Sequence, residues 1–311
     1  MYADEIVENK TSNAVGKYAL THRNVDVDAV VSTYLLSKLA GYRVVLDVND
    51  IPNNAEVVVV DMPITKQILS ALNAKNCTLL GVLDHHSGED YTCAAEAVAE
   101  FLKLNPDSAY KYLIELAESC DCGLILSEPE YLRLFHISGI LAVMRFNGKS
   151  DYEILEEMYR ILDMYIPYLE ELLEAERIVE AIPVISVGGY SVAVVNKPTN
   201  LINQVLFNNK EVDLIIYKDR YNLGIIRNAE IDMPDLSKLK SIILELLEAK
   251  GKKEEINEWF FHPDGFITAR GTRKHPAKTP SVLGTNDLLK ALLMLMNPEF
   301  REKSGDSNAT R

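Results

Sequence analysis

The stretch LLGVLDHH, residues 79–86, decides the fold, because an apolar run ends there in Asp-His-His. A short continuous apolar run is typical of a buried strand in a parallel sheet. Two earlier runs end in the same way, YALTH at 18–22 and VVVVD at 57–61. In open parallel sheets, ligands bind beyond the carboxyl ends of the strands. We therefore predict that these three strand ends bring imidazoles and carboxylates to one place.

The remaining pattern predicts an α/β protein of two domains. In the N-terminal half, helical segments follow the strands, at 29–40, 64–74, 93–104 and 107–119. This alternation predicts a parallel sheet with helices on both faces. The pattern restarts near residue 183, with strands at 190–195, 212–217 and 221–227, helices at 199–208, 235–249 and 285–296, and an aromatic, basic loop at 259–280. We predict a metal-binding domain at 1–150, a helical connector at 151–182 and a smaller α/β domain at 183–311.

Composition limits the classes of function. The chain has 311 residues and a net charge of -14, which argues against broad binding to long nucleic acids or anionic membranes. A phosphate substrate held by metals in a local pocket is compatible with that charge. No apolar run is long enough to span a membrane, and we expect no signal peptide. We expect a cytoplasmic protein that does not bind membranes, and its four cysteines are too few for a disulfide scaffold.

The polar residues at the strand ends suit a pair of metals. His22, Asp26 and Asp28 form the pattern His-x-x-x-Asp-x-Asp, in which each aspartate can bind a different ion. Asp61, at a neighbouring strand end, can bridge two ions with its two oxygens. Asp28 and Asp61 could instead cap helices. Three of the six histidines lie in these motifs, however, which favours the metal interpretation.

Adjacent histidines offer two different functions. His85 and His86 project differently, so one can bind a metal while the other faces a substrate. Two metals about 3.5–4 Å apart lower the pKa of a bridging water and neutralise a phosphoryl transition state. Mixed carboxylate and imidazole ligands favour manganese, with magnesium or cobalt as alternatives. The predicted cofactors are therefore two divalent metal ions.

These motifs resemble those of the DHH phosphoesterase superfamily. The resemblance rests on HRNVDVDA at 22–29, on VVVVDMP at 57–63 and on LDHHSG at 83–88, in the same order and relative spacing. It covers most of the N-terminal half and implies a DHH-like catalytic domain. The implied ligands of one metal are His22, Asp26 and Asp61. Those of the second are Asp28, Asp61 and His85.

The resemblance implies three further roles. His86 would contact the scissile phosphate, and Asp84 would orient a histidine. The family has another metal-binding aspartate downstream, for which Asp121 is the best match, although a helix-terminal aspartate would explain it equally well. Val25 stands where the family commonly has proline.

The C-terminal half resembles the DHHA1 substrate domain less strongly. The strand at 221–227 ends in Arg227, like a strand of that domain. The usual Gly-Gly-Gly-His loop is absent, and HPA at 275–277 could be a degenerate form of it. The basic residues that follow the aromatic segment are a phosphate-binding candidate. The predicted substrate-binding residues are Arg227, Arg270, Arg273, Lys274 and His275.

Four functions compete at this point. The leading one is a manganese-dependent phosphodiesterase that hydrolyses short oligonucleotides, or linear or cyclic dinucleotides, to mononucleotides. It would need no extended nucleic-acid tracking surface, and a homodimer is one option for its assembly. The second is an inorganic pyrophosphatase of the family II type, or a polyphosphatase. The remaining two are a nucleotide phosphatase and an inactive nucleotide-binding module.

Overall fold

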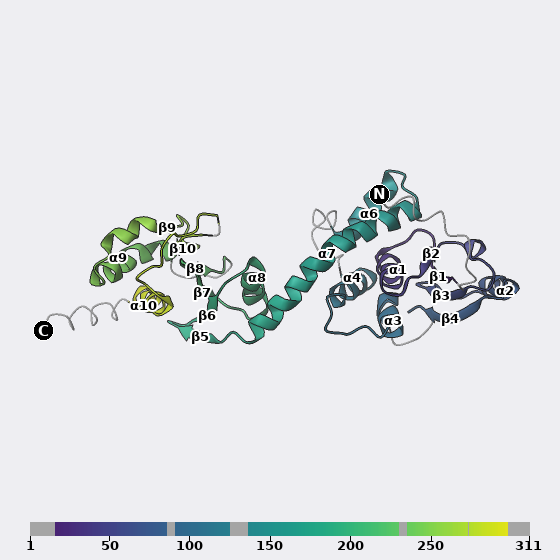
Figure 1. Ribbon diagram of the computed structural model, residues 1–311, viewed down its shortest axis with the longest axis horizontal. Coiled ribbons are helices and arrows are strands. Elements are labelled where there is room, and N and C mark those ends of the chain that lie inside the picture. The colour runs from purple at the N-terminus through teal and green to yellow at the C-terminus, as the bar shows by residue number, and fades with distance from the viewer. Residues whose placement is uncertain (1–15, 86–90, 125–135, 230–234, 273, 298–311) are drawn as a thin grey trace. The chain divides into compact units, whose positions relative to one another are not determined.

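The computed structural model describes residues 16–85, 91–124, 136–229, 235–272 and 274–297 (Figure 1). The chain divides into two compact units, Met1–Glu170 and Glu171–Arg311. Each unit has its own sheet and its own hydrophobic core. This confirms the α/β class with two sheets.

The sheet of the first unit has four parallel strands. They are β1 (Lys17–Leu20), β2 (Arg43–Val45), β3 (Glu56–Val60) and β4 (Thr78–Leu83), in the order β2-β1-β3-β4. Side chains alternate between the two faces of a strand. Accordingly, Val58 and Val60 of β3 pack into one core, whereas Val57 and Val59 pack into another. A strand buried on both faces explains the uninterrupted valine run, because neither face meets water.

Helices cover both faces of this sheet, as predicted. The larger core contains residues of α1 (Val27–Ala40), α3 (Ala94–Phe101), α4 (Lys111–Asp121), α6 (Ile137–Phe146) and the first part of α7 (Asp151–Glu180). The opposite face is covered by α2 (Lys66–Ala74) and the short helix η1 (Val48–Asp50). Helix α1 is capped at its start by Asp26, whose side chain accepts a bond from the Ala29 amide, and at its end by Gly41 in the left-handed conformation.

The second unit has a mixed sheet of six strands. They are β5 (Val184–Val187), β6 (Tyr190–Asn196), β7 (Leu214–Asp219), β8 (Asn222–Arg227), β9 (Trp259–Phe261) and β10 (Ile267–Arg270), in the order β5-β6-β7-β8-β10-β9. Only the β6–β7 pair is parallel among these strands. The prediction of a loop across 259–280 was wrong for β9 and β10. These strands have three and four residues, too few for a periodic pattern. β10 is held by pairing with β8, and β9 by pairing with β10.

Helices also cover this second sheet. Helices α9 (Leu239–Ala249) and α10 (Thr285–Met296) pack on one face, and α8 (Asn200–Asn209) packs on the other with the end of α7. Two short helices, η3 (Leu236–Lys238) and η4 (Lys253–Glu258), complete this unit's described elements. No helix in the described ranges combines the length and apolar composition that crossing a bilayer requires.

Arg270 lies inside the second unit and binds its neighbours there. Its side chain is 1% exposed. The guanidinium donates to Glu258 Oε2 at 2.6 Å and to Thr279 Oγ1 at 3.0 Å, and its Nε lies 3.3 Å from Glu255 Oε1. Glu255 is itself buried. Because this guanidinium joins β10 to η4 and to residue 279, we do not retain the predicted role of Arg270 in substrate binding.

We expect Arg270→Met to destabilise the second unit by about 3–5 kcal/mol, because it leaves the Glu255 carboxylate buried without its cation. Urea unfolding followed by the fluorescence of Trp259, the only tryptophan, reports on this unit. The matched control is Glu258→Gln, which removes a 52% exposed partner and should cost less than about 1 kcal/mol. Equal unfolding free energies for Arg270→Met and the wild type would contradict this structural role.

Candidate metal centre

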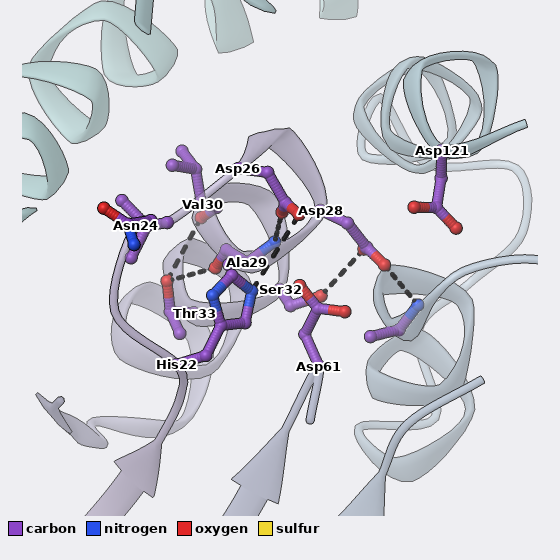
Figure 2. A network of polar contacts seen from close by, with 12 residues as sticks. His22, Asn24, Asp26, Asp28, Ala29, Val30, Ser32, Thr33, Asp61 and Asp121 are labelled. Carbon is purple, nitrogen blue, oxygen red and sulfur yellow. Dashed lines mark hydrogen bonds and ion pairs between the residues drawn. The ribbon is translucent and has the colours of Figure 1, made fainter. Parts of the chain in front are cut away.

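The carboxyl ends of β1, β3 and β4 bring the predicted ligands together. Asp61 directly follows β3 and has a φ of 53°, so the backbone turns sharply where the strand ends. Its amide donates to the carbonyl of Leu83, the last residue of β4, at 2.9 Å. Figure 2 shows the side chains of His22, Asp26 and Asp28 around Asp61, with Asp121 nearby on another helix.

The first group consists of His22, Asp26 and Asp61. The His22 Nε2 lies 3.0 Å from Asp61 Oδ2 and 3.9 Å from Asp26 Oδ2. The His22 Nδ1 lies 2.8 Å from the Arg23 carbonyl, to which it can donate. That bond orients the ring so that Nε2 faces both carboxylates, as second-sphere bonds do for metal-binding histidines.

The second group consists of Asp28, His85 and Asp121. The His85 Nε2 lies 3.0 Å from Asp121 Oδ2, and its Nδ1 lies 3.6 Å from Asp28 Oδ2. Asp121 is the last residue of α4, so this helix delivers the carboxylate from outside the sheet. Asp84, which is fully buried, also belongs to a cluster with Asp61 and His85.

Asp61 connects the two groups. Its Oδ2 faces His22, and its Oδ1 lies 3.9 Å from His85 Nδ1. The side chain is only 4% exposed, so its position is fixed by its surroundings. One carboxylate thus presents a different oxygen to each group.

Asp28 has a second function that the sequence did not reveal. Its oxygens accept bonds from the amides of Ala94 at 2.6 Å and Ala95 at 2.8 Å, and Ser32 Oγ donates at 3.2 Å. Asp28 therefore caps the start of α3, whose own Cys93 makes no side-chain capping bond. Sequence patterns are local, so they could not predict this contact between Asp28 and Ala94, which lie 66 residues apart.

The electrostatics of the centre follow from burial. The hydrogen bond to Asp61 raises the pKa of His22 to about 9, although burial of the imidazole opposes the shift. Burial raises the pKa of the Asp61 carboxyl, and His22 opposes this shift. Burial likewise raises the pKa of Asp28, against the two amide bonds from α3. The fold thus concentrates carboxylates whose charge is poorly solvated, which a bound cation would offset.

The geometry and the donor types fit divalent ions. In each group, one donor atom from every residue lies within 4.8 Å of the others. Neighbouring ligands on an octahedral ion are about 3 Å apart when each metal–ligand bond is about 2.1 Å. The donors are carboxylate oxygens and imidazole nitrogens, a set that suits manganese and related ions. The residues present could therefore hold two metals.

Other predicted site residues lie elsewhere. His86 and Arg273 lie outside the described residues. Lys274 and His275 are exposed in the second unit, where a turn joins the Thr272 amide to the His275 carbonyl. Arg227 ends β8, with its guanidinium 4.6 Å from the centre of the Phe266 ring.

Arg227 also lines an open pocket of about 620 Å³ in the second unit. Its lining residues are Gln204, Phe207, Asn208, Arg227, Asn228 and Ala229. Sequence reasoning named only Arg227 among them and missed the other five, of which Gln204, Phe207 and Asn208 come from α8. Their spacing of three and four residues places them on one face of α8, but the segment carries no motif that marks it as a ligand site.

Solved structures resemble this chain only distantly. An uncharacterized protein from Helicobacter pylori G27 is 13% identical, with 91% of this chain and 99% of that chain covered, at a TM-score of 0.24. RecJ from Thermus thermophilus, in complex with Mn²⁺, is 12% identical over 91% of this chain and 57% of that chain, at a TM-score of 0.32. Another structure, of exonuclease RecJ bound to manganese, is 10% identical, with 92% and 90% covered and a TM-score of 0.27.

For the first unit, sequence comparison gives a more specific match than the comparison of structures does. No curated protein matches the chain. The family model described as the DHH family, N-terminal domain, matches residues 18–139. That range includes both groups of candidate ligands, and all of the first sheet except Lys17 at the start of β1. Over residues 18–139 the chain is therefore similar to the N-terminal domain of the DHH family.

Proposed function

We propose that the chain is a two-metal phosphoesterase that hydrolyses phosphodiester bonds of short oligonucleotides, or of linear or cyclic dinucleotides, and releases mononucleotides. The observation that carries the proposal is the placement of Asp61. Its Oδ2 is 3.0 Å from His22 Nε2, and its Oδ1 is 3.9 Å from His85 Nδ1. A carboxylate so placed can bridge two ions, for which manganese is the leading candidate and magnesium or cobalt are alternatives.

The residues of the centre would bind two different ions. His22, Asp26 and Asp61 would hold one ion, and Asp28, Asp61, His85 and Asp121 the other. Two ions held in this way activate a water and offset the charge of a phosphoryl transition state. Asp26 is 57% exposed, so the first ion would be accessible from solvent. The roles of His86 at the phosphate and of Asp84 as an orienting residue remain predictions.

The second unit supports a nucleotide substrate. The pocket beside Arg227 combines the amides of Gln204, Asn208 and Asn228 with the ring of Phe207. Side-chain amides pair with base edges, and an aromatic ring can stack on a base. A guanidinium binds phosphate in a bidentate manner. We infer that this pocket holds one nucleotide of a short substrate, which suits the net charge of -14 better than a long polyanion does.

We expect two manganese ions per chain in equilibrium dialysis with metal analysis. Asp61→Ala should lose both, because the variant removes the bridging oxygens. Asp121→Asn should weaken the second site and abolish turnover while the first site still binds. The control is Asp50→Ala, an aspartate of the first unit that is part of no described metal group. Two ions retained in Asp61→Ala would refute the bridge.

Metal binding should release a proton from His22. At pH 7.5 the His22 imidazole is mostly protonated, since its pKa is about 9. A metal binds the neutral ring, so binding at the first site releases about one proton and tightens as pH rises toward 9. Calorimetry at pH 7.5 in buffers of different ionisation enthalpy measures the release. His22→Gln should lose it, and a wild-type binding enthalpy independent of the buffer would contradict the expectation.

The pocket should affect binding of nucleotides but not the chemistry of small esters. We expect Arg227→Met to raise the KM for a dinucleotide about tenfold, because a phosphate contact is lost. The rate with bis(p-nitrophenyl) phosphate, which carries no base, should stay within about twofold. Lys210→Met is the matched control, since Lys210 follows α8 outside the pocket and binds two backbone carbonyls. Faster turnover of pyrophosphate than of any dinucleotide would favour the pyrophosphatase alternative.

A further inference from the structure

The loop between His22 and Asp26 is held by residues from far along the chain. Asp151 accepts a bond from the Asn24 amide at 2.9 Å through Oδ2, and one from the Val25 amide at 3.2 Å through Oδ1. Arg145 of α6 donates to the Val25 carbonyl. These contacts bind three polar backbone groups of a three-residue loop. The loop thus depends on residues more than a hundred positions away.

The conformation of this loop needs such support. Asn24 has a φ of 60°, in the left-handed region that costs energy for residues other than glycine. The next residue, Val25, is fully buried. Its amide therefore needs a protein partner, which Asp151 provides. Without this carboxylate, the loop would lose the bonds that fix its course between the two ligands.

The helix that contains Asp151 has a side-chain cap at its start that does not involve this carboxylate. Asp151 is the first residue of α7, and the start of that helix is capped by a separate pair. Glu153 accepts bonds from the Ser150 amide at 2.8 Å and from the Ser150 hydroxyl at 2.6 Å. Both described bonds of the Asp151 carboxylate go to the loop instead. This arrangement separates the contribution of Asp151 to the loop from the stability of α7.

We propose that Asp151 is a positioning residue for the first metal site, and this rests on the proposed two-metal function. By fixing the backbone between His22 and Asp26, it sets the 3.9 Å separation of their donor atoms. The second site draws on Asp28, His85 and Asp121, which lie outside this loop. Loss of Asp151 should therefore weaken one metal site and spare the other. Residues that orient metal ligands typically change affinity about 10–100-fold when removed.

The test is calorimetric titration of the full chain with Mn²⁺. We expect Asp151→Ala to weaken one of the two sites about tenfold or more and to leave the other within about twofold. Asp151→Asn should be intermediate, because its amide oxygen can accept only one of the two loop bonds. In both variants, hydrogen exchange of the Asn24 and Val25 amides should accelerate. The matched control is Asp163→Ala on the same helix, whose carboxylate binds Tyr34 and Lys38 instead.

Each of the following results would overturn the proposal. Unchanged affinity at both sites in Asp151→Ala would show that the loop keeps its position without the carboxylate. Equal weakening of both sites, or the same effect in Asp163→Ala, would show a general loss of stability. If Asp151→Ala fails to fold, Asp151→Asn provides the test, and wild-type Mn²⁺ affinities at both sites of that variant would contradict the proposal. If the wild type binds no Mn²⁺, the two-metal function fails as well. The results named before this one leave that function standing.

Discussion

The burial of carboxylates at one edge of the first sheet is the constraint on which the surrounding structure depends. Asp28, Asp61 and Asp84 are 2%, 4% and 0% exposed. A buried carboxylate is costly unless hydrogen bonds or opposite charges compensate it. The start of α3 provides two amides for Asp28, and His22 lies against Asp61. The pKa values of Asp28 and Asp61 are still raised, so compensation is incomplete and divalent cations would complete it.

The same constraint explains why the centre is assembled from distant segments. A strand end supplies only one or two side chains, so the strand ends alone do not complete the candidate group of Asp28, His85 and Asp121. Helix α4 therefore contributes Asp121 from outside the sheet, and α3 fixes Asp28 through its first amides. The backbone between the candidate ligands is fixed as well. In the loop after His22, Asp151 accepts bonds from two backbone amides. Each of these contacts joins elements that are adjacent only in the folded chain.

The sequence could predict what depends on local pattern. The valine run of β3 indicated a strand buried on both faces, and the polar residue after each run indicated the ligand edge. The sequence could not predict that Asp28 caps α3, because only tertiary packing brings Asp28 beside Ala94. The assignment of Arg270 to a substrate site was misleading for a similar reason. Arg270 lies close to other cations in sequence, but Glu255 and Glu258 surround it in the folded unit.

Helix α7 contributes residues to a hydrophobic core of each unit. Its first residue holds the loop of the metal centre, and its last turns bring Ala175 and Val179 into the core of the second unit. Pro167 lies within the helix, close to the boundary after Glu170. Proline has no amide to donate to the preceding turn, so one helical bond is missing there. The Asp151 contacts belong to the first unit and the packing of Val179 to the second, so neither includes the helical bond that is missing at Pro167.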